Sequence, residues 1–148
     1  MTFLRRFVQV FVAFFRKLAP RHDLAPEMPL ARFLMSSSHY TSGRVTHHAF
    51  LPNPNDGLLS AFEVEGLSEA TIHAIGMDHV LIARRRLHGY ATLIIEVVLK
   101  QSLTVSRDEP PPRHVNVGQW PDTKDARKLV ALELASVANL VLFSDQVI

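Results

Sequence analysis

The chain of 148 residues contains no cysteine. Disulfide bonds, thiol catalysis and cysteine-ligated zinc or iron–sulfur centres are therefore excluded, and a cytoplasmic location is compatible with the composition. A large charge of one sign is also missing, because the formal net charge is only +2. So small an excess permits a polyanionic partner without requiring one.

The sequence also lacks the motifs of several large enzyme classes. It contains no G-x-x-x-x-G-K-[ST], G-x-G-x-x-G or H-E-x-x-H pattern, which argues against a P-loop ATPase, a Rossmann enzyme and a zincin. Apolar residues make up 47% and charged residues 20% of the chain, as in ordinary folded proteins. The length suits one domain with a real core.

One apolar run stands at the N-terminus. Eight of the nine residues from Phe7 to Phe15 are apolar, and arginine and lysine bracket them. A bilayer-spanning helix needs about 20 apolar residues, so this run is too short, and the positive charge after it argues against a secretory signal. We expect residues 1–19 to form an amphipathic helix that docks on the domain or on a partner. The alternatives are association with a membrane surface and a dispensable extension.

The remainder predicts an α+β domain. Residues 20–29 carry three prolines and indicate an extended linker, which leaves a single domain over residues 30–148. We expect a small, mostly antiparallel sheet with two or three helices packed on one face.

Strands are predicted over 30–35, 44–50 and 58–64, and the last two should form a hairpin around the Asp56-Gly57 turn. A first helix should begin at residue 69 with Ser68 as its N-cap, and a final helix should run over 122–142 with Asp122 as its N-cap. Helix and strand compete over 77–101, and the spacing slightly favours a helix over 92–101 followed by a strand over 103–106. The stripe of the final helix expected to face the core comprises Ala126, Val130, Leu134, Val137 and Val141.

The stretch from Asp108 to Pro121 carries the strongest hint of a site. It holds four of the nine prolines and the only tryptophan. Three successive prolines fix φ and remove backbone donors, so this segment restricts where Arg113 and His114 point.

An arginine in this position suits an anionic ligand, because guanidinium binds phosphate or carboxylate in bidentate fashion. His39 lies in a second polar loop beside a predicted strand end. One of His39 and His114 would serve as base and the other as acid in phosphoester chemistry. Further binding residues are expected on the same surface: Asn116, Trp120, Lys124, Arg127 and Lys128.

Other constellations are weaker. His47 and His48 are adjacent, so on a strand they face opposite sides and do not chelate one metal. We therefore expect neither a metal nor a cofactor. The run from Ser36 to Ser38 lies near His39, but it has no nearby carboxylate to orient a base, which argues against a serine nucleophile there.

Several short motifs resemble a family of small uncharacterised bacterial proteins. They are Arg32-Phe33-Leu34, Ser36 to Tyr40, Ala49 to Pro52, Pro110 to His114 with Asn116, and Trp120-Pro121, with the pattern S-x-H-[FY], P-P-R-H-x-N-[IV] and W-P. The resemblance covers about residues 30–140 and leaves the N-terminal run outside it. It implies a compact domain that starts near Leu30, and it assigns no activity.

Two functional hypotheses follow from these residues, with a third from the N-terminus. The first is a small interaction or accessory protein that binds a partner protein or a polyanion through the Pro110–His114 surface. The second is a small metal-independent enzyme acting on a phosphate-containing substrate with His39, Arg113 and His114. The third is a membrane-surface protein anchored by residues 1–19. The second hypothesis requires His39 and His114 to meet in one concave pocket.

Overall fold

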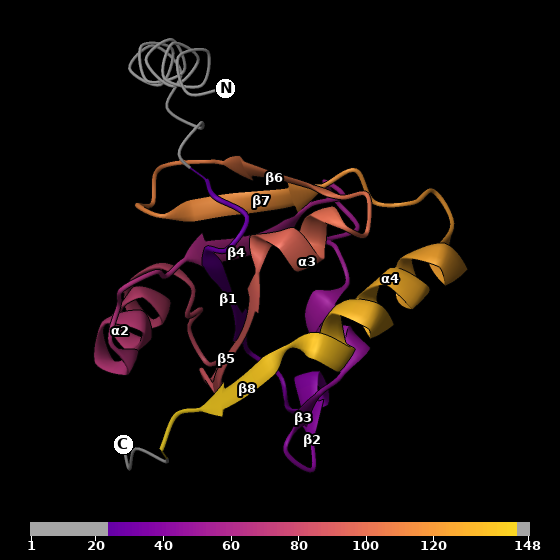
Figure 1. Ribbon diagram of the computed structural model, residues 1–148. Helices are drawn as coiled ribbons and strands as arrows, with labels where there is room; N and C mark the ends of the chain where they lie inside the picture. Colours follow the sequence, from indigo (N-terminus) through magenta and orange to yellow (C-terminus); the bar gives the residue numbers. More distant parts are fainter. Residues whose placement is uncertain (1–23, 145–148) are drawn as a thin grey trace, which may run out of the picture.

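The computed structural model describes residues 24–144 and is built around a six-stranded antiparallel sheet (Figure 1). The strand order in this sheet is β6-β7-β4-β1-β5-β8. The strands of the sheet are β1 (Pro29–Leu34), β4 (Leu59–Glu63), β5 (Gly89–Ile94), β6 (Thr104–Arg107), β7 (His114–Gly118) and β8 (Asn139–Leu142). Two short strands, β2 (Tyr40–Thr41) and β3 (Arg44–Val45), form a separate hairpin. The predicted α+β class and antiparallel sheet are thus confirmed, whereas the predicted helix over 1–19 lies outside the described residues.

Helices cover both faces of the sheet, so the prediction that they pack on one face was wrong. Helices α3 (Ile95–Leu99) and α4 (Lys124–Val137) lie on one face, and α2 (Glu69–His79) lies on the other (Figure 1). The alternation along β1 explains this arrangement: Leu30 and Leu34 join the core under α4, whereas Phe33 joins the cluster under α2. A central strand that is apolar on both faces needs cover on both.

Strands β1 and β4 and the start of helix α2 agree with the prediction from the sequence. Strands β1 and β4 occupy the predicted ranges to within a residue or two. Helix α2 starts after Ser68, whose hydroxyl accepts a hydrogen bond from the Thr71 amide at 3.2 Å. This is the N-cap arrangement in which a serine oxygen satisfies a free amide of the first turn.

The predicted hairpin of 44–50 with 58–64 does not form. Strand β3 is two residues long and pairs with β2, and His47–Phe50 forms the 3-10 helix η3. Strand β4 pairs instead with β7 and β1. The physical reason is burial: as a 3-10 turn, the segment places Phe50, 1% exposed, in the core against α4.

The chain between 77 and 107 divides differently from either predicted alternative. Strand β5 ends at Ile94, helix α3 follows at once, and β6 begins at Thr104. Residues 24–28 of the predicted linker also contact this region. The Met28 side chain is 8% exposed, and its carbonyl accepts a hydrogen bond from the Ile95 amide.

The last helix is shorter than predicted and starts from a different cap. Thr123, not Asp122, accepts the hydrogen bond from the Ala126 amide. The helix ends at Val137, and β8 then pairs with β5 and becomes the edge strand on that side of the sheet. The buried positions are Ala131, Leu134 and Ala135, so the predicted stripe was correct at Leu134 and wrong at Val137, which is 51% exposed.

Candidate functional site

An open cleft of about 710 Å³ lies beside the ends of β1 and β4, and we call it the Arg32 cleft. Strands β1 and β5 pair at six positions, but β1 and β4 pair only at Leu30↔Glu63 and Ala31↔Phe62. The sheet therefore opens beyond Ala31. The cleft is lined by Arg32, His39, His48, Ser60, Asp108, His114 and Asn116, together with residues of the 51–58 loop.

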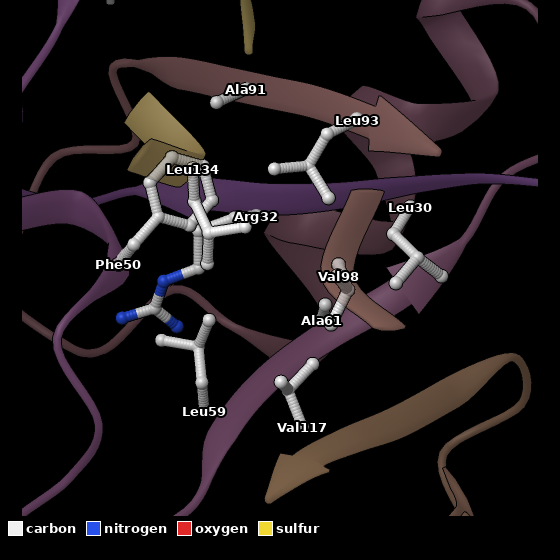
Figure 2. Close-up of a pocket in the computed structure, with 10 residues that line it drawn as sticks. All are labelled: Leu30, Arg32, Phe50, Leu59, Ala61, Ala91, Leu93, Val98, Val117 and Leu134. Carbon is white, nitrogen blue, oxygen red and sulfur yellow. The ribbon is translucent and has the colours of Figure 1, made fainter. Parts of the chain in front are cut away.

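The guanidinium of Arg32 takes the place of the missing strand pairing. Its Nη1 donates to the Ser60 main-chain oxygen at 3.1 Å, and its Nε donates to the Ala49 oxygen at 2.8 Å. Figure 2 shows its side chain among apolar neighbours that include Phe50 and Leu59. The void between those apolar residues is only about 10 Å³, no more than the space of one water, so it has no room for a larger ligand.

Arg32 has no carboxylate partner among the described residues. Burial lowers the pKa of Arg32 to about 10, which still leaves it charged at neutral pH. Taking a charge out of water costs free energy unless an opposite charge compensates it. Within residues 24–144, Nε and Nη1 of Arg32 donate to two carbonyl oxygens, which carry no full negative charge.

His39 enters the cleft from the 3-10 helix η2 (Ser37–His39), which directly follows β1. Burial, and then the charges of Arg32, His48, His88 and Arg85, lower the pKa of His39 to about 4. The ring is thus neutral at neutral pH. Its Nδ1 is buried and has no hydrogen-bond partner in the described part of the chain. Such an orphaned polar atom is rare in native structures.

His114 approaches the cleft from β7. Its Nε2 lies 2.5 Å from the Ser60 hydroxyl oxygen, and its Nδ1 lies 2.9 Å from the Asp108 main-chain oxygen. The Asp108 carboxylate is 3.5 Å from the same Nδ1 and accepts a hydrogen bond from Asn116 Nδ2 at 3.0 Å. The imidazole is therefore held on both of its nitrogens, next to a hydroxyl that faces the cleft.

The structure brings His39 and His114 to one concave site but directs Arg113 elsewhere. The Arg113 guanidinium donates to the Glu63 carboxylate at 3.1 Å, and that carboxylate is also 3.8 Å from Arg107. Arg113 does not line the Arg32 cleft. Arg113 precedes β7 and has a φ of 70°, so its backbone is not that of an extended strand, and its contact with Glu63 separates it from His114.

The predicted binding residues divide between two places. Asn116 lines the Arg32 cleft, whereas Trp120, Lys124 and Arg127 line a second open cleft of about 810 Å³. Residues of the 51–58 loop line both clefts and so lie between them. Lys128 is exposed on α4 and lines neither cleft.

Arg127 and Trp120 have evident structural contacts. Arg127 donates to the main-chain oxygens of Pro121 and Asp122 at the start of α4. The Trp120 indole N–H donates to the Val117 oxygen at 3.0 Å, and its ring packs against the core.

Sequence reasoning missed Arg32 and Ser60, and it passed over Asp108. A signal existed for Arg32, because it is the one charged residue in the apolar run from Leu30 to Met35. Ser60 comes to His114 through the pairing of β4 with β7, whereas Asp108 comes to the same histidine through the pairing of β6 with β7.

Metal ligation finds no support in the described residues, since no group of three histidine or acidic side chains is placed to hold an ion. No helix within residues 24–144 is long and apolar enough to cross a membrane. Comparisons of the chain with protein-family models, curated proteins and solved structures found no match.

Proposed function

We propose that this protein is a small metal-independent enzyme that acts on a phosphate-containing substrate in the Arg32 cleft. Arg32 would bind the phosphate, the role that the sequence assigned to Arg113. His39 and His114 would hold and move protons. The observation that carries the proposal is the charged guanidinium of Arg32, which lines the cleft and has no carboxylate partner within residues 24–144.

Phosphate fits this environment on two grounds. Its oxygens accept bidentate hydrogen bonds from guanidinium, and such charge-assisted bonds are about twice as strong as neutral ones. The neutral ring of His39 lines the same cleft as that cation, so it can contact a phosphate bound there. The two carboxylates that line the cleft, Asp56 and Asp108, already accept hydrogen bonds from Leu58 N and Asn116 Nδ2.

The partner-binding alternative draws less support from the geometry. Pro110 and Pro112 are exposed, as a docking segment requires. The charge of Arg113, however, is paired with Glu63, and the basic residues of α4 lie beyond the 51–58 loop. A partner that contacts both His114 and the basic residues of α4 would have to span two clefts. The membrane alternative depends on residues 1–19, which lie outside the described part of the chain.

Titration with inorganic phosphate, followed by NMR of the histidine ring protons, tests the proposal. We expect saturable shifts of His39 and His114 in the wild-type protein. Arg32→Gln should weaken binding by about tenfold or more, because one charge-assisted contact is worth about 1.5–3 kcal/mol. Arg44→Gln is the matched control, since Arg44 is an exposed arginine that does not line this cleft.

A second variant guards against an Arg32 replacement that unfolds the protein. His39→Gln removes the ring but none of the hydrogen bonds of Arg32, and it should also weaken phosphate binding. Turnover is then measured with p-nitrophenyl phosphate and bis(p-nitrophenyl) phosphate. Linear, non-saturating shifts that are equal in the wild type and Arg32→Gln would show that the cleft holds no phosphate site.

A further inference from the structure

The contact between Ser60 and His114 has a direction that the hydrogen bonds determine. A main-chain carbonyl can only accept a hydrogen bond, so His114 Nδ1, 2.9 Å from the Asp108 oxygen, must carry a proton. In the neutral imidazole the other nitrogen, Nε2, then has a free lone pair. Ser60 Oγ, at 2.5 Å, is consequently the donor and Nε2 the acceptor. This is the arrangement of a hydroxyl beside its general base.

The rest of the site holds that arrangement in place. The Asp108 carboxylate lies 3.5 Å from Nδ1, where a negative charge stabilises the imidazolium that forms when Nε2 takes a proton. Asn116 in turn holds this carboxylate at 3.0 Å. The Phe62 ring packs edge-on against His114, with ring centroids 5.2 Å apart, and restricts the imidazole from another side.

Ser60 is also open to a substrate. Its side chain is half-buried in the middle of β4 and lines the Arg32 cleft. Arg32 holds the main-chain oxygen of this same residue. A phosphate bound to the guanidinium therefore lies in the cleft onto which the Ser60 hydroxyl opens.

We propose that Ser60 is a nucleophile activated by His114, with Asp108 and Asn116 as positioning residues. The substrate class, a phosphoric ester, rests on the proposed function. Ser60 Oγ attacks phosphorus and forms an O–P bond while its proton passes to His114 Nε2. The P–O bond to the alcohol breaks, and His114 returns the proton to the departing oxygen. Water then attacks the phosphoserine, gives a proton to His114, and releases phosphate as Ser60 Oγ takes that proton back.

A fluorophosphonate probe tests the nucleophile without knowledge of the natural substrate. Attack by Ser60 forms an O–P bond, breaks the P–F bond and releases fluoride, and His114 takes the hydroxyl proton. We expect one adduct by intact mass, located on Ser60 by peptide mapping and absent from Ser60→Ala. Labelling of His114→Gln should be slower by about a hundredfold or more, because the base is lost.

Ser106 provides a matched control. Ser60 and Ser106 are both strand partners of Asn116, on either side of it, but Ser106 is exposed and does not line the cleft. Ser106→Ala should label like the wild type. Labelling that persists in Ser60→Ala, or none in the wild type, would overturn the proposal.

A cysteine exchange keeps the test decisive if Ser60→Ala does not fold. The natural chain has no cysteine, so Ser60→Cys and Ser106→Cys each carry a single thiol. Near pH 6, iodoacetamide should alkylate the cysteine of Ser60→Cys at least about tenfold faster than that of Ser106→Cys, because His114 accepts the thiol proton and leaves the reactive thiolate. Exposure alone predicts the opposite order, and that order would refute the activation.

The outcomes separate this proposal from the proposed function. Saturable phosphate binding without labelling of Ser60 would refute the nucleophile and keep the phosphate site. Labelling of Ser60 without phosphate binding would support the nucleophile and refute the substrate class.

Discussion

The pH dependence of stability gives a direct test of how the cleft environment acts on His39. Burial, together with the charges of Arg32, His48, His88 and Arg85, lowers the pKa of His39 from 6.5 to about 4. Between pH 4 and pH 6.5, His39 is largely protonated in the unfolded chain and largely neutral in the folded protein. Stability is therefore fully present above about pH 6.5 and is lost as the pH falls toward 4.

The magnitude follows from the size of the shift. Each unit of pKa difference corresponds to about 1.4 kcal/mol, so the full shift corresponds to about 3 kcal/mol. Because the His39 ring is only partly withdrawn from water, we expect about 1–2 kcal/mol. Burial also lowers the pKa of His47 and His88, which adds loss in the same direction. A comparison with His39→Gln isolates the contribution of His39.

Urea unfolding followed by fluorescence provides the assay, because Trp120 is the only tryptophan and is half-buried. Between about pH 6.5 and 4.5 the free energy of unfolding should fall less steeply in His39→Gln than in the wild type. His79→Gln, at an exposed position of α2, is the control and should follow the wild type. Added phosphate should flatten the wild-type profile, because a bound anion offsets the charge of Arg32. Parallel profiles for the wild type and His39→Gln would refute the reasoning.

Three further substitutions test the packing. Leu134→Asp places a carboxylate at a position that is 1% exposed, so it should cost about 4 kcal/mol or more of stability. Replacing the exposed Lys128 by alanine should cost less than about 0.5 kcal/mol. Thermal melts compare the two variants, and a Leu134→Asp protein that melts like the wild type would show that a different face of α4 is buried. Gly89→Ala should cost about 2–3 kcal/mol in urea unfolding, because the added Cβ would lie within 2.8 Å of the β8 backbone, which cannot move aside as a side chain can. Unchanged stability would mean that β8 does not pair with β5 at this position. Arg113→Ala should cost about 1–2 kcal/mol in the same assay, because it removes an ion-pair partner of Glu63, whose side chain is 9% exposed. An unchanged unfolding midpoint together with weaker phosphate binding would show instead that Arg113 contributes to the ligand site.

Features that depend on nearby residues could be predicted from the sequence. The apolar run of β1, the Ser68 cap and the position of β4 are set by neighbours within a few positions, and the structure confirms them. The absence of cysteine excluded whole classes of chemistry before any fold was known. His39 and His114 could be selected for the same reason, because polar residues at strand ends are local features.

Tertiary structure decided everything that required a choice of partner. Propensity made residues 44–50 a strand, but burial of Phe50 under α4 made part of them a 3-10 helix. The apolar residues after Val137 fit a continued helix equally well, but in the structure Asn139–Leu142 pair with the edge of β5 as strand β8.

The site shows the same division. Sequence spacing placed Arg113 beside His114, whereas in the structure Arg113 pairs with Glu63 and Arg32 lines the cleft. Ser60 and His114 meet only because β4 pairs with β7 in one register, and a shift of one residue would turn them to opposite faces. Local pattern was therefore enough to select the two histidines, and long-range strand pairing determined which residues line the cleft with them.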